Sequence, residues 1–290
     1  MSLKQITATN VDDLISKLEQ AALAAGWNSA SNGVFKARAG DARTFNISKY
    51  TYRSKDYVRL ALDNSVNDMQ RAMAGPMVTY YRTWFKIEIS PVPYIVVIVE
   101  QEPSSLYFFS FGYLESVNGS VSEDCYISGQ GYPSSYTQVK GSIVDAGGLL
   151  ADYKMTSSDD YPGGVYSNGS FYSSGGDRDT DVYNMSGGGI PSHRIAALLL
   201  CGNNTIGSTQ LITKPLIWGS KIGETVRTPL GYLPIHAISM EFLTSGQKVQ
   251  LAGTDYVAFS LGKKSYSSDP AYPYVNGTTY FYWGFALEDN

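Results

Sequence analysis

The clearest pattern of apolar and polar positions along the chain predicts one α-helix over residues 10–25. Asn10 is a favourable N-cap, because its side chain can accept a hydrogen bond from a free backbone N–H of the first turn. Gly26 is a natural stop at the other end. Apolar residues recur at intervals of three and four, which places them on one stripe: Val11, Leu14, Ile15, Leu18, Ala22 and Ala25. We expect this stripe to pack against a sheet.

From residue 34 onward the period of the pattern changes to two, which is typical of β-strands. Segments that alternate, or that are rich in strand-forming residues, are separated by turn residues. We predict strands at 34–40, 43–52, 57–64, 194–202, 208–219, 233–242, 247–262 and 278–287. The T-S-G sequence at 244–246 is predicted to be a hairpin turn. No fixed-period repeat relates the strands, which argues against a solenoid or a propeller.

Residues 93–114, PYIVVIVEQEPSSLYFFSFGYL, predict a β-hairpin. Its two strands, PYIVVIVEQ and LYFFSFGYL, are joined by the turn E-P-S-S. In the second strand Leu106 and Phe108 leave one face of the sheet, whereas Phe109 and Phe111 leave the other. Apolar side chains on both faces indicate a central strand, or a strand that a partner covers.

The stretch 156–190 differs from its surroundings, since it holds eight glycines and few aliphatic residues. Loops of this length in a compact domain usually bind something or link two parts. The predicted fold is therefore mainly β (α+β) in three parts. Residues 1–150 form a lobe with the helix packed on a β-sheet, residues 151–190 form a Gly/Ser-rich contact loop, and residues 191–290 form a second, β-sandwich-like lobe.

Composition adds low charge and many tyrosines to this picture. Charged residues make up 17% of the chain, below the roughly 25% usual in globular proteins, whereas 23 residues are Tyr and 29 are Gly. Tyrosine offers a large contact area with a polar tip, so it suits interfaces, but an all-β protein also needs aromatic residues in its strands. Composition and periodicity together favour a β-rich assembly or binding protein.

Charge and hydropathy also bear on partners. The formal net charge is −4, and no run of Lys and Arg is dense enough to follow a phosphate backbone, so we expect no nucleic-acid partner. The start MSLKQITATN lacks the apolar stretch of a secretory signal. The most apolar run, YIVVIV at 94–99, is too short to span a bilayer, so we expect no membrane partner either.

Residues suited to catalysis are scarce. The two histidines, His193 and His236, are the only side chains that normally titrate near neutral pH, and no G-x-S-x-G motif accompanies them. We expect no catalytic site, no enzymatic activity and no cofactor. A hydrolase that uses one of the two histidines is kept as an alternative hypothesis.

Metal binding and disulfide formation have weak signals. Asp177, Asp179 and Asp181 alternate as the carboxylates of a calcium loop do, but the Gly and Glu that an EF-hand needs further on are missing. We expect no metal site, and calcium at these three residues stays an open alternative. Cys125 and Cys201 could pair, although two reduced and buried thiols are the favoured interpretation.

At residues 83–114 the chain resembles a group of virion structural proteins from tailed bacteriophages. In this region a Trp-containing strand precedes a β-branched strand, a short turn and an aromatic strand, here at Trp84, 95–99, Ser104–Ser105 and the F-G-Y-L of 111–114. A Gly/Ser/Pro-rich segment follows in that group as it does here. GYLPIH at 231–236 is similar to a turn that precedes a histidine in the group's C-terminal half.

The resemblance implies a building block of the tail, neck (collar) or baseplate, located in the virion and present as a ring or set of copies. It implies other virion structural proteins and further copies of the chain as partners, and it carries over no enzymatic residues. A receptor- or carbohydrate-binding adhesin module of a phage fibre is the alternative. The candidate contact residues are the aromatic residues Tyr161, Tyr166, Phe171, Tyr172 and Tyr183 in the loop and Trp218 and Tyr232 in the second lobe.

Overall fold

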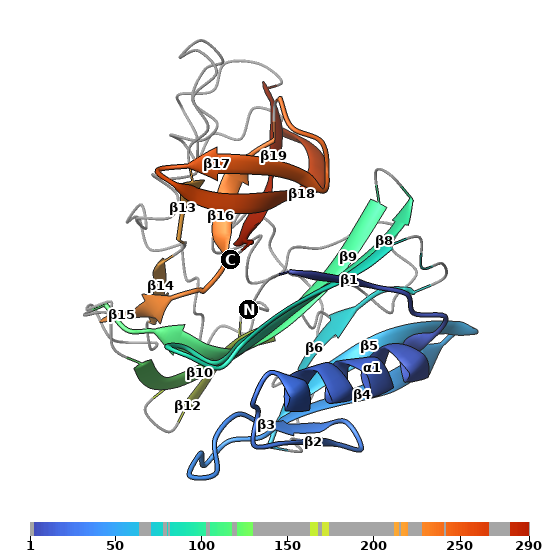
Figure 1. Cartoon of the computed structure of the whole chain (residues 1–290), viewed down its shortest axis with the longest axis vertical. Coiled ribbons are helices and arrows are strands. Elements are labelled where there is room, and N and C mark those ends of the chain that lie inside the picture. Colours follow the sequence, from blue (N-terminus) through green and yellow to red (C-terminus); the bar gives the residue numbers. More distant parts are fainter. Residues whose placement is uncertain are drawn as a thin grey trace.

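The computed structural model describes residues 3–63, 71–77, 80, 82–102, 105–117, 121–129, 163–167, 170–173, 212–214, 216–219, 228–240, 242–266 and 279–289. These residues form one α-helix and three antiparallel β-sheets, which confirms the mainly β fold expected from the sequence (Figure 1). No helix within these ranges is both long and apolar enough to cross a membrane.

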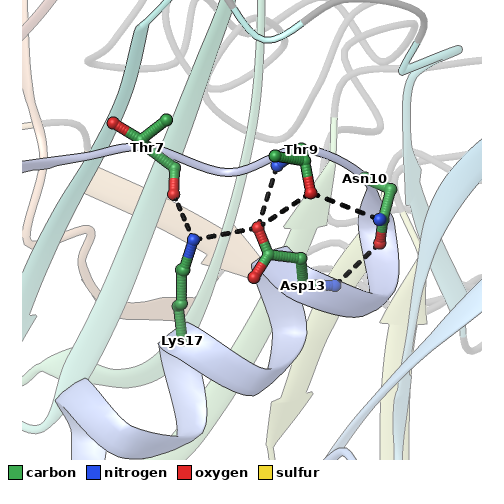
Figure 2. A network of polar contacts seen from close by, with 5 residues as sticks. All are labelled: Thr7, Thr9, Asn10, Asp13 and Lys17. Carbon is green, nitrogen blue, oxygen red and sulfur yellow. Dashed lines mark hydrogen bonds and ion pairs between the residues drawn. The ribbon is translucent and has the colours of Figure 1, made fainter.

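Helix α1 (Val11–Ala24) follows the predicted range closely, and a polar network fixes its first turn. Asn10 Oδ1 accepts a hydrogen bond from the backbone N–H of Asp13 at 2.9 Å. The carboxylate of Asp13 accepts from the backbone N–H of Thr9 and from Lys17 Nζ, each at 2.9 Å, and Lys17 Nζ also donates to Thr7 O (Figure 2). The network satisfies free N–H groups at a helix end where the dipole also favours a carboxylate.

The N-terminal sheet consists of five strands that follow one another both in sequence and in space. They are β2 (Ser29–Ser31), β3 (Val34–Lys36), β4 (Phe45–Tyr52), β5 (Lys55–Leu62) and β6 (Arg71–Ala74). Figure 1 shows α1 lying along β4 and β5. The predicted packing of the helix on a sheet is therefore observed, and the buried side of the helix carries the predicted Val11, Leu14, Leu18 and Ala22.

The central sheet has nine strands and contains the predicted hairpin. Its main path runs through β1 (Lys4–Ile6), β7 (Arg82–Glu88), β8 (Tyr94–Glu102), β9 (Ser105–Glu115), β10 (Val121–Gly129), β11 (Gly163–Ser167) and β12 (Ser170–Ser173). Strands β8 and β9 pair with each other in antiparallel register. The hairpin of β14 (Leu216–Gly219) and β15 (Thr228–Tyr232) joins the sheet where Tyr232 pairs with Glu115 of β9.

The C-terminal sheet has five strands whose order in space differs from their order in sequence. Neighbouring strands are β13 (Ile212–Thr213), β16 (His236–Ser239), β19 (Thr279–Glu288), β18 (Thr254–Tyr266) and β17 (Gln247–Leu251). The predicted hairpin at 244–246 is wrong, because β17 pairs with β18 and not with β16, and the T-S-G turn only leads the chain into β17. The hairpin turn is Ala252-Gly253, where both residues have a positive φ.

The central sheet is buried on both faces, as its two-sided apolar pattern indicates. Figure 1 shows it between the C-terminal sheet and the layer of α1 and the N-terminal sheet. On one face Phe111 packs against Phe45, with ring centroids 5.2 Å apart. On the other face Phe108 packs against Phe285 at 4.9 Å. The chain itself therefore covers both faces, so these aromatic side chains are core residues and no partner is needed to bury them.

Part of the predicted contact loop over 151–190 is a β-hairpin, so the prediction of a loop is wrong there. Strands β11 and β12 pair with each other, and β11 also pairs with β10, where Tyr166 lies opposite Cys125. The Asn-Gly sequence at 168–169, between two short runs of strand-forming residues, is a hairpin signal that the many glycines obscured. The other residues of 151–190 lie outside the described ranges. The central sheet takes strands from all three predicted parts, and the division into two lobes stays a prediction.

Candidate contact surface

One face of the β4–β5 hairpin gathers tyrosine and basic side chains. Tyr50 lies opposite Tyr57 and Tyr52 lies opposite Lys55 in the antiparallel register, and residues paired in this way leave the same face of the sheet. The Tyr50 and Tyr57 ring centroids are 6.5 Å apart. Tyr57 is buried and forms the base of the group, whereas the residues around it reach the surface. We name the group Tyr50, Tyr52, Arg53, Lys55 and Arg59 the hairpin face.

The two arginines of the hairpin face lie over tyrosine rings. The Arg53 guanidinium carbon is 5.3 Å from the ring centroid of Tyr52, and that of Arg59 is 5.6 Å from the centroid of Tyr50. Arg59 Nε also donates a hydrogen bond to Ser48 Oγ at 3.3 Å. Such cation–π contacts restrain long side chains at a surface. The guanidinium groups are thus held in place without a carboxylate.

The positive charges of the hairpin face have no compensating partner. No carboxylate of the described residues forms an ion pair with Arg53, Lys55 or Arg59. Elsewhere in the described residues carboxylates pair with the cations Lys17, Arg43, Lys49, Arg82, Lys86, Lys214 and Lys248, whereas Lys4, Lys36 and Arg38 form none of these ion pairs. The hairpin face is therefore a local concentration of positive charge in a chain whose net charge is −4.

The opposite face of the same hairpin carries carboxylates beside its one cation. Lys49 forms an ion pair with Asp12 at the start of α1. Thr51 Oγ1 donates a hydrogen bond to Asp56 Oδ1 at 2.7 Å. The fold thus separates the charges of the hairpin, since the only acidic residue between Ser48 and Arg59 lies on the face away from the three free cations.

The two residues at the tip of the hairpin have a backbone conformation that is unfavourable for their residue types. Arg53 and Ser54 form a two-residue turn in which φ is +48° and +60°, a region that favours glycine and asparagine. The chain places Asn32-Gly33 and Ala252-Gly253 in its two other described turns of this kind, both with a glycine second. Strained backbone persists where the surrounding structure holds it, and it clusters at functional sites. Arg53 is therefore a candidate contact residue.

The predicted aromatic contact residues lie on two other hairpins. Tyr166 lies opposite Phe171, and Tyr172 opposite Val165, in the β11–β12 hairpin at the end of the central sheet. Trp218 lies opposite Pro229 in the β14–β15 hairpin, where Tyr232 is opposite Leu216. Tyr161 and Tyr183 lie outside the described residues. The structure thus brings the predicted residues into two groups, and neither group includes a residue of the hairpin face. Their role in contacts stays a prediction.

A simple charge count reveals the hairpin face in the sequence. Residues 48–59, SKYTYRSKDYVR, hold four cations and one carboxylate, a net charge of +3. Alternate positions of this segment carry Tyr or basic residues, which places them on one face of a strand. The prediction placed the contact tyrosines mainly at 151–190, where the glycine content is high, and so did not include this segment.

His236 is the one histidine within the described ranges, and its surroundings are structural. Its Nε2 lies 3.9 Å from Glu288 Oε1, beyond hydrogen-bond distance, and its ring makes an edge contact with Tyr256. Burial, aided by the nearby charge of Lys214, lowers the pKa of His236 to about 4. A general base at neutral pH needs a pKa nearer 7. The site therefore gives no support to a hydrolase that uses His236, and the lack of enzymatic activity stays a prediction.

The other candidates for chemistry give no site within the described residues. There, no group of three or more His, Cys, Asp or Glu side chains is arranged to hold a metal ion. Cys125 is a free, buried thiol, and burial raises its pKa to about 12, so the thiol stays protonated. His193, Cys201 and the calcium candidates Asp177, Asp179 and Asp181 lie outside the described ranges.

No protein-family model matches the sequence, and no curated protein is similar to it.

Proposed function

We propose that the protein is a structural component of a tailed-phage virion, in the tail, neck or baseplate, and that it binds neighbouring subunits through the hairpin face. The observation that carries the binding role is the set of cations Arg53, Lys55 and Arg59, which have no ion-pair partner and lie beside tyrosines at the surface. The virion setting is supported by the resemblance at residues 83–114. The expected partners are other virion proteins and further copies of the chain.

Binding explains the distribution of polar groups better than catalysis does. Charged groups inside the protein pair with each other: Lys86, which is 1% exposed, contacts Glu88 at 2.9 Å, and Arg82 pairs with Glu100. Such pairs offset the cost of burying charge. Tyrosine and arginine, by contrast, are the residue types that most often dominate the energy of a protein interface. Both lie together on the hairpin face.

The carbohydrate-binding alternative fits the hairpin face less well. A sugar stacks on the open face of an aromatic ring, but the Tyr50 and Tyr52 rings each already have a guanidinium group over one face. Moving that group would expose an unpaired cation and lose the cation–π contact. A glycan array probed with the full chain separates the two functions, because binding to a defined neutral sugar would favour the adhesin.

Co-expression with candidate tail, neck and baseplate proteins tests the proposed function. The test variant is Arg53→Glu with Arg59→Glu, and the matched control is Lys4→Glu with Arg38→Glu, which changes the net charge equally at two exposed positions away from the hairpin face. We expect the native chain and the control to enter a complex in light scattering, whereas the test variant stays unbound although it still unfolds in one cooperative thermal transition. Equal assembly of the test variant and the native chain would contradict the proposal.

A further inference from the structure

We infer that the hairpin face binds an acidic protein surface whose carboxylates pair with Arg53 and Arg59. The inference rests on the proposed function and deepens it, because it names the chemistry of the partner at the same site. Residues 48–59 carry +3, which leaves −7 for the rest of the chain. Lys49 is neutralised by Asp12, so Arg53, Lys55 and Arg59 remain as free charge on one face.

The geometry of the two arginines suits carboxylates in particular. A guanidinium group that lies over a tyrosine ring keeps its N–H groups available at the edge of its plane. A carboxylate can then accept two parallel hydrogen bonds from that edge. Arg59 uses its Nε on Ser48 Oγ at 3.3 Å and keeps its two terminal nitrogen atoms for a ligand. Because the rings already restrain both side chains, less conformational freedom is lost on binding.

The turn at the tip presents the first of these arginines. Arg53 has φ +48° and Ser54 has φ +60°, so an arginine occupies a backbone position where glycine or asparagine has the lower energy. The side chain of Lys55, the next residue, is also exposed. The projecting end of the hairpin is thus built from basic residues at the cost of turn stability, which fits a surface that meets a partner's carboxylates.

A local acidic surface fits the hairpin face better than a nucleic acid does. Binding to nucleic acid rests chiefly on Lys and Arg contacts to many phosphates along the backbone, whereas the hairpin face offers three cations. The net charge of −7 on the other residues would repel an extended polyanion. A patch of a few carboxylates on a folded partner matches the three cations in number and avoids that repulsion.

Fluorescence anisotropy with the full chain tests the inference. One labelled probe is a short peptide with three glutamates spaced by glycine around a central tyrosine, and its matched probe has glutamine in place of every glutamate. A single-stranded oligothymidylate is the nucleic-acid probe. We expect the glutamate peptide to bind at low ionic strength and to weaken with added salt, whereas the glutamine peptide does not bind. Arg53→Glu with Arg59→Glu is expected to weaken the glutamate peptide about tenfold or more, and Lys4→Glu with Arg38→Glu to leave it unchanged.

A conservative variant separates the contribution of the paired hydrogen bonds to binding from the contribution of charge. Arg53→Lys with Arg59→Lys keeps both charges but removes the planar group, and we expect it to weaken the glutamate peptide roughly fivefold. The inference is overturned if the glutamate peptide fails to bind the native chain, if the glutamine peptide binds equally well, or if the oligothymidylate binds more tightly. If the variant Arg53→Glu with Arg59→Glu fails to assemble and the glutamate peptide does not bind the native chain, the proposed function stands and only the acidic partner is ruled out. If the glutamate peptide binds the native chain but this variant assembles normally, the binding of an acidic surface stands and the role of the hairpin face in assembly is ruled out.

Discussion

The hydroxyl group of Tyr126 donates a hydrogen bond to Ser110 Oγ, 2.7 Å away, inside the core between the central and C-terminal sheets. The direction follows from the second bond of Ser110, whose single hydroxyl hydrogen points to Ile95 O at 2.9 Å. Both side chains are fully buried, and burial raises the pKa of Tyr126, so the phenol keeps its proton. The two bonds therefore fix β8, β9 and β10 to each other, on a face of the central sheet that also buries Ser128 and Lys86.

Removing either partner of this pair should have unequal effects on the free energy of unfolding. Ser110→Ala leaves the Tyr126 hydroxyl as a buried donor without an acceptor, which should cost about 1–3 kcal/mol. Tyr126→Phe leaves Ser110 still bonded to Ile95 O and should cost about 1 kcal/mol. Urea denaturation of both variants measures the difference.

The double variant Ser110→Ala with Tyr126→Phe is the control for this prediction. It removes both polar groups together, so it should be more stable than Ser110→Ala alone. A Tyr126→Phe variant that loses as much stability as Ser110→Ala would show that the assigned direction of the hydrogen bond is wrong.

Local patterns in the sequence were enough to predict α1 and the hairpin of β8 and β9. The single strands predicted at 208–219 and 247–262 are wrong, because the first range holds β13 and β14, which lie in different sheets, and the second holds the β17–β18 hairpin. Helix α1 follows from its apolar stripe and from the cap at Asn10, and the burial of β8 and β9 on both faces follows from their two-sided apolar pattern. The error at β11 and β12 arose because glycine content outweighed a short hairpin signal. The high glycine content of the long stretch 156–190 therefore outweighed, in the prediction, the Asn-Gly turn signal at 168–169.

The contact surface was harder to predict, because it depends on tertiary pairing. The sequence shows four cations between Ser48 and Arg59 but not which of them are neutralised. Lys49 is paired only because the fold brings the start of α1 beside β4. The same limit applies to the position of β15, which joins β9 through the pair of Tyr232 and Glu115. Contacts between residues this distant leave no periodic signal along the chain.

Gly112 interrupts the aromatic strand β9 for a steric reason, so its replacement should be costly. Its φ is +150°, and a Cβ atom there would lie 2.4 Å from Pro93 O and 2.6 Å from Tyr94 Cα. We expect Gly112→Ala to lower the free energy of unfolding by about 3 kcal/mol or more, because the obstacles are backbone atoms that cannot turn away. Thermal and urea denaturation of the full chain measure the loss.

Gly253 provides the matched control for Gly112. It also has a positive φ, +84°, but no atom lies within 4 Å of a Cβ built on it. Gly253→Ala should therefore cost only the conformational term, about 1 kcal/mol. Equal losses for the two variants would mean that the close approach of Pro93 to β9 does not decide the need for glycine.

His236 should make the protein less stable as the pH falls from 6.5 towards 4. Its pKa is lowered to about 4 in the folded state, from 6.5, chiefly by burial and then by Lys214, while Glu288 and Glu115 oppose the shift. The unfolded chain therefore takes up this proton first, so the contribution is fully present above pH 6.5 and is lost on acidification. The loss between pH 7 and pH 5 should be about 2 kcal/mol.

The variant His236→Gln separates this effect from that of other titrating groups. It cannot take up a proton in this range, so its free energy of unfolding should fall less steeply between pH 7 and pH 5 than that of the native chain. Urea denaturation at several pH values gives both slopes, and His193 contributes equally to each. Parallel slopes would exclude His236 as the source.

Exchanging the turn at the tip of the β4–β5 hairpin should separate stability from binding. Arg53→Asn with Ser54→Gly replaces two residues held at positive φ by the pair that favours this two-residue turn, so it should stabilise the fold by about 1 kcal/mol. The same change removes one of the two guanidinium groups of the hairpin face and should weaken assembly. Urea denaturation and light scattering with the partner proteins measure the two effects on one sample.

The two readouts together decide why the chain keeps an arginine and a serine at this turn. A more stable variant that assembles poorly would show that the strained turn is retained for contact, a trade of stability against function. Exchanging only Ser54→Gly provides the control, because it should relieve strain at one position while leaving Arg53 over the Tyr52 ring. That single variant should gain stability and assemble normally. If the double variant also assembles normally, Arg53 is not part of the contact, and the unfavourable turn needs another explanation.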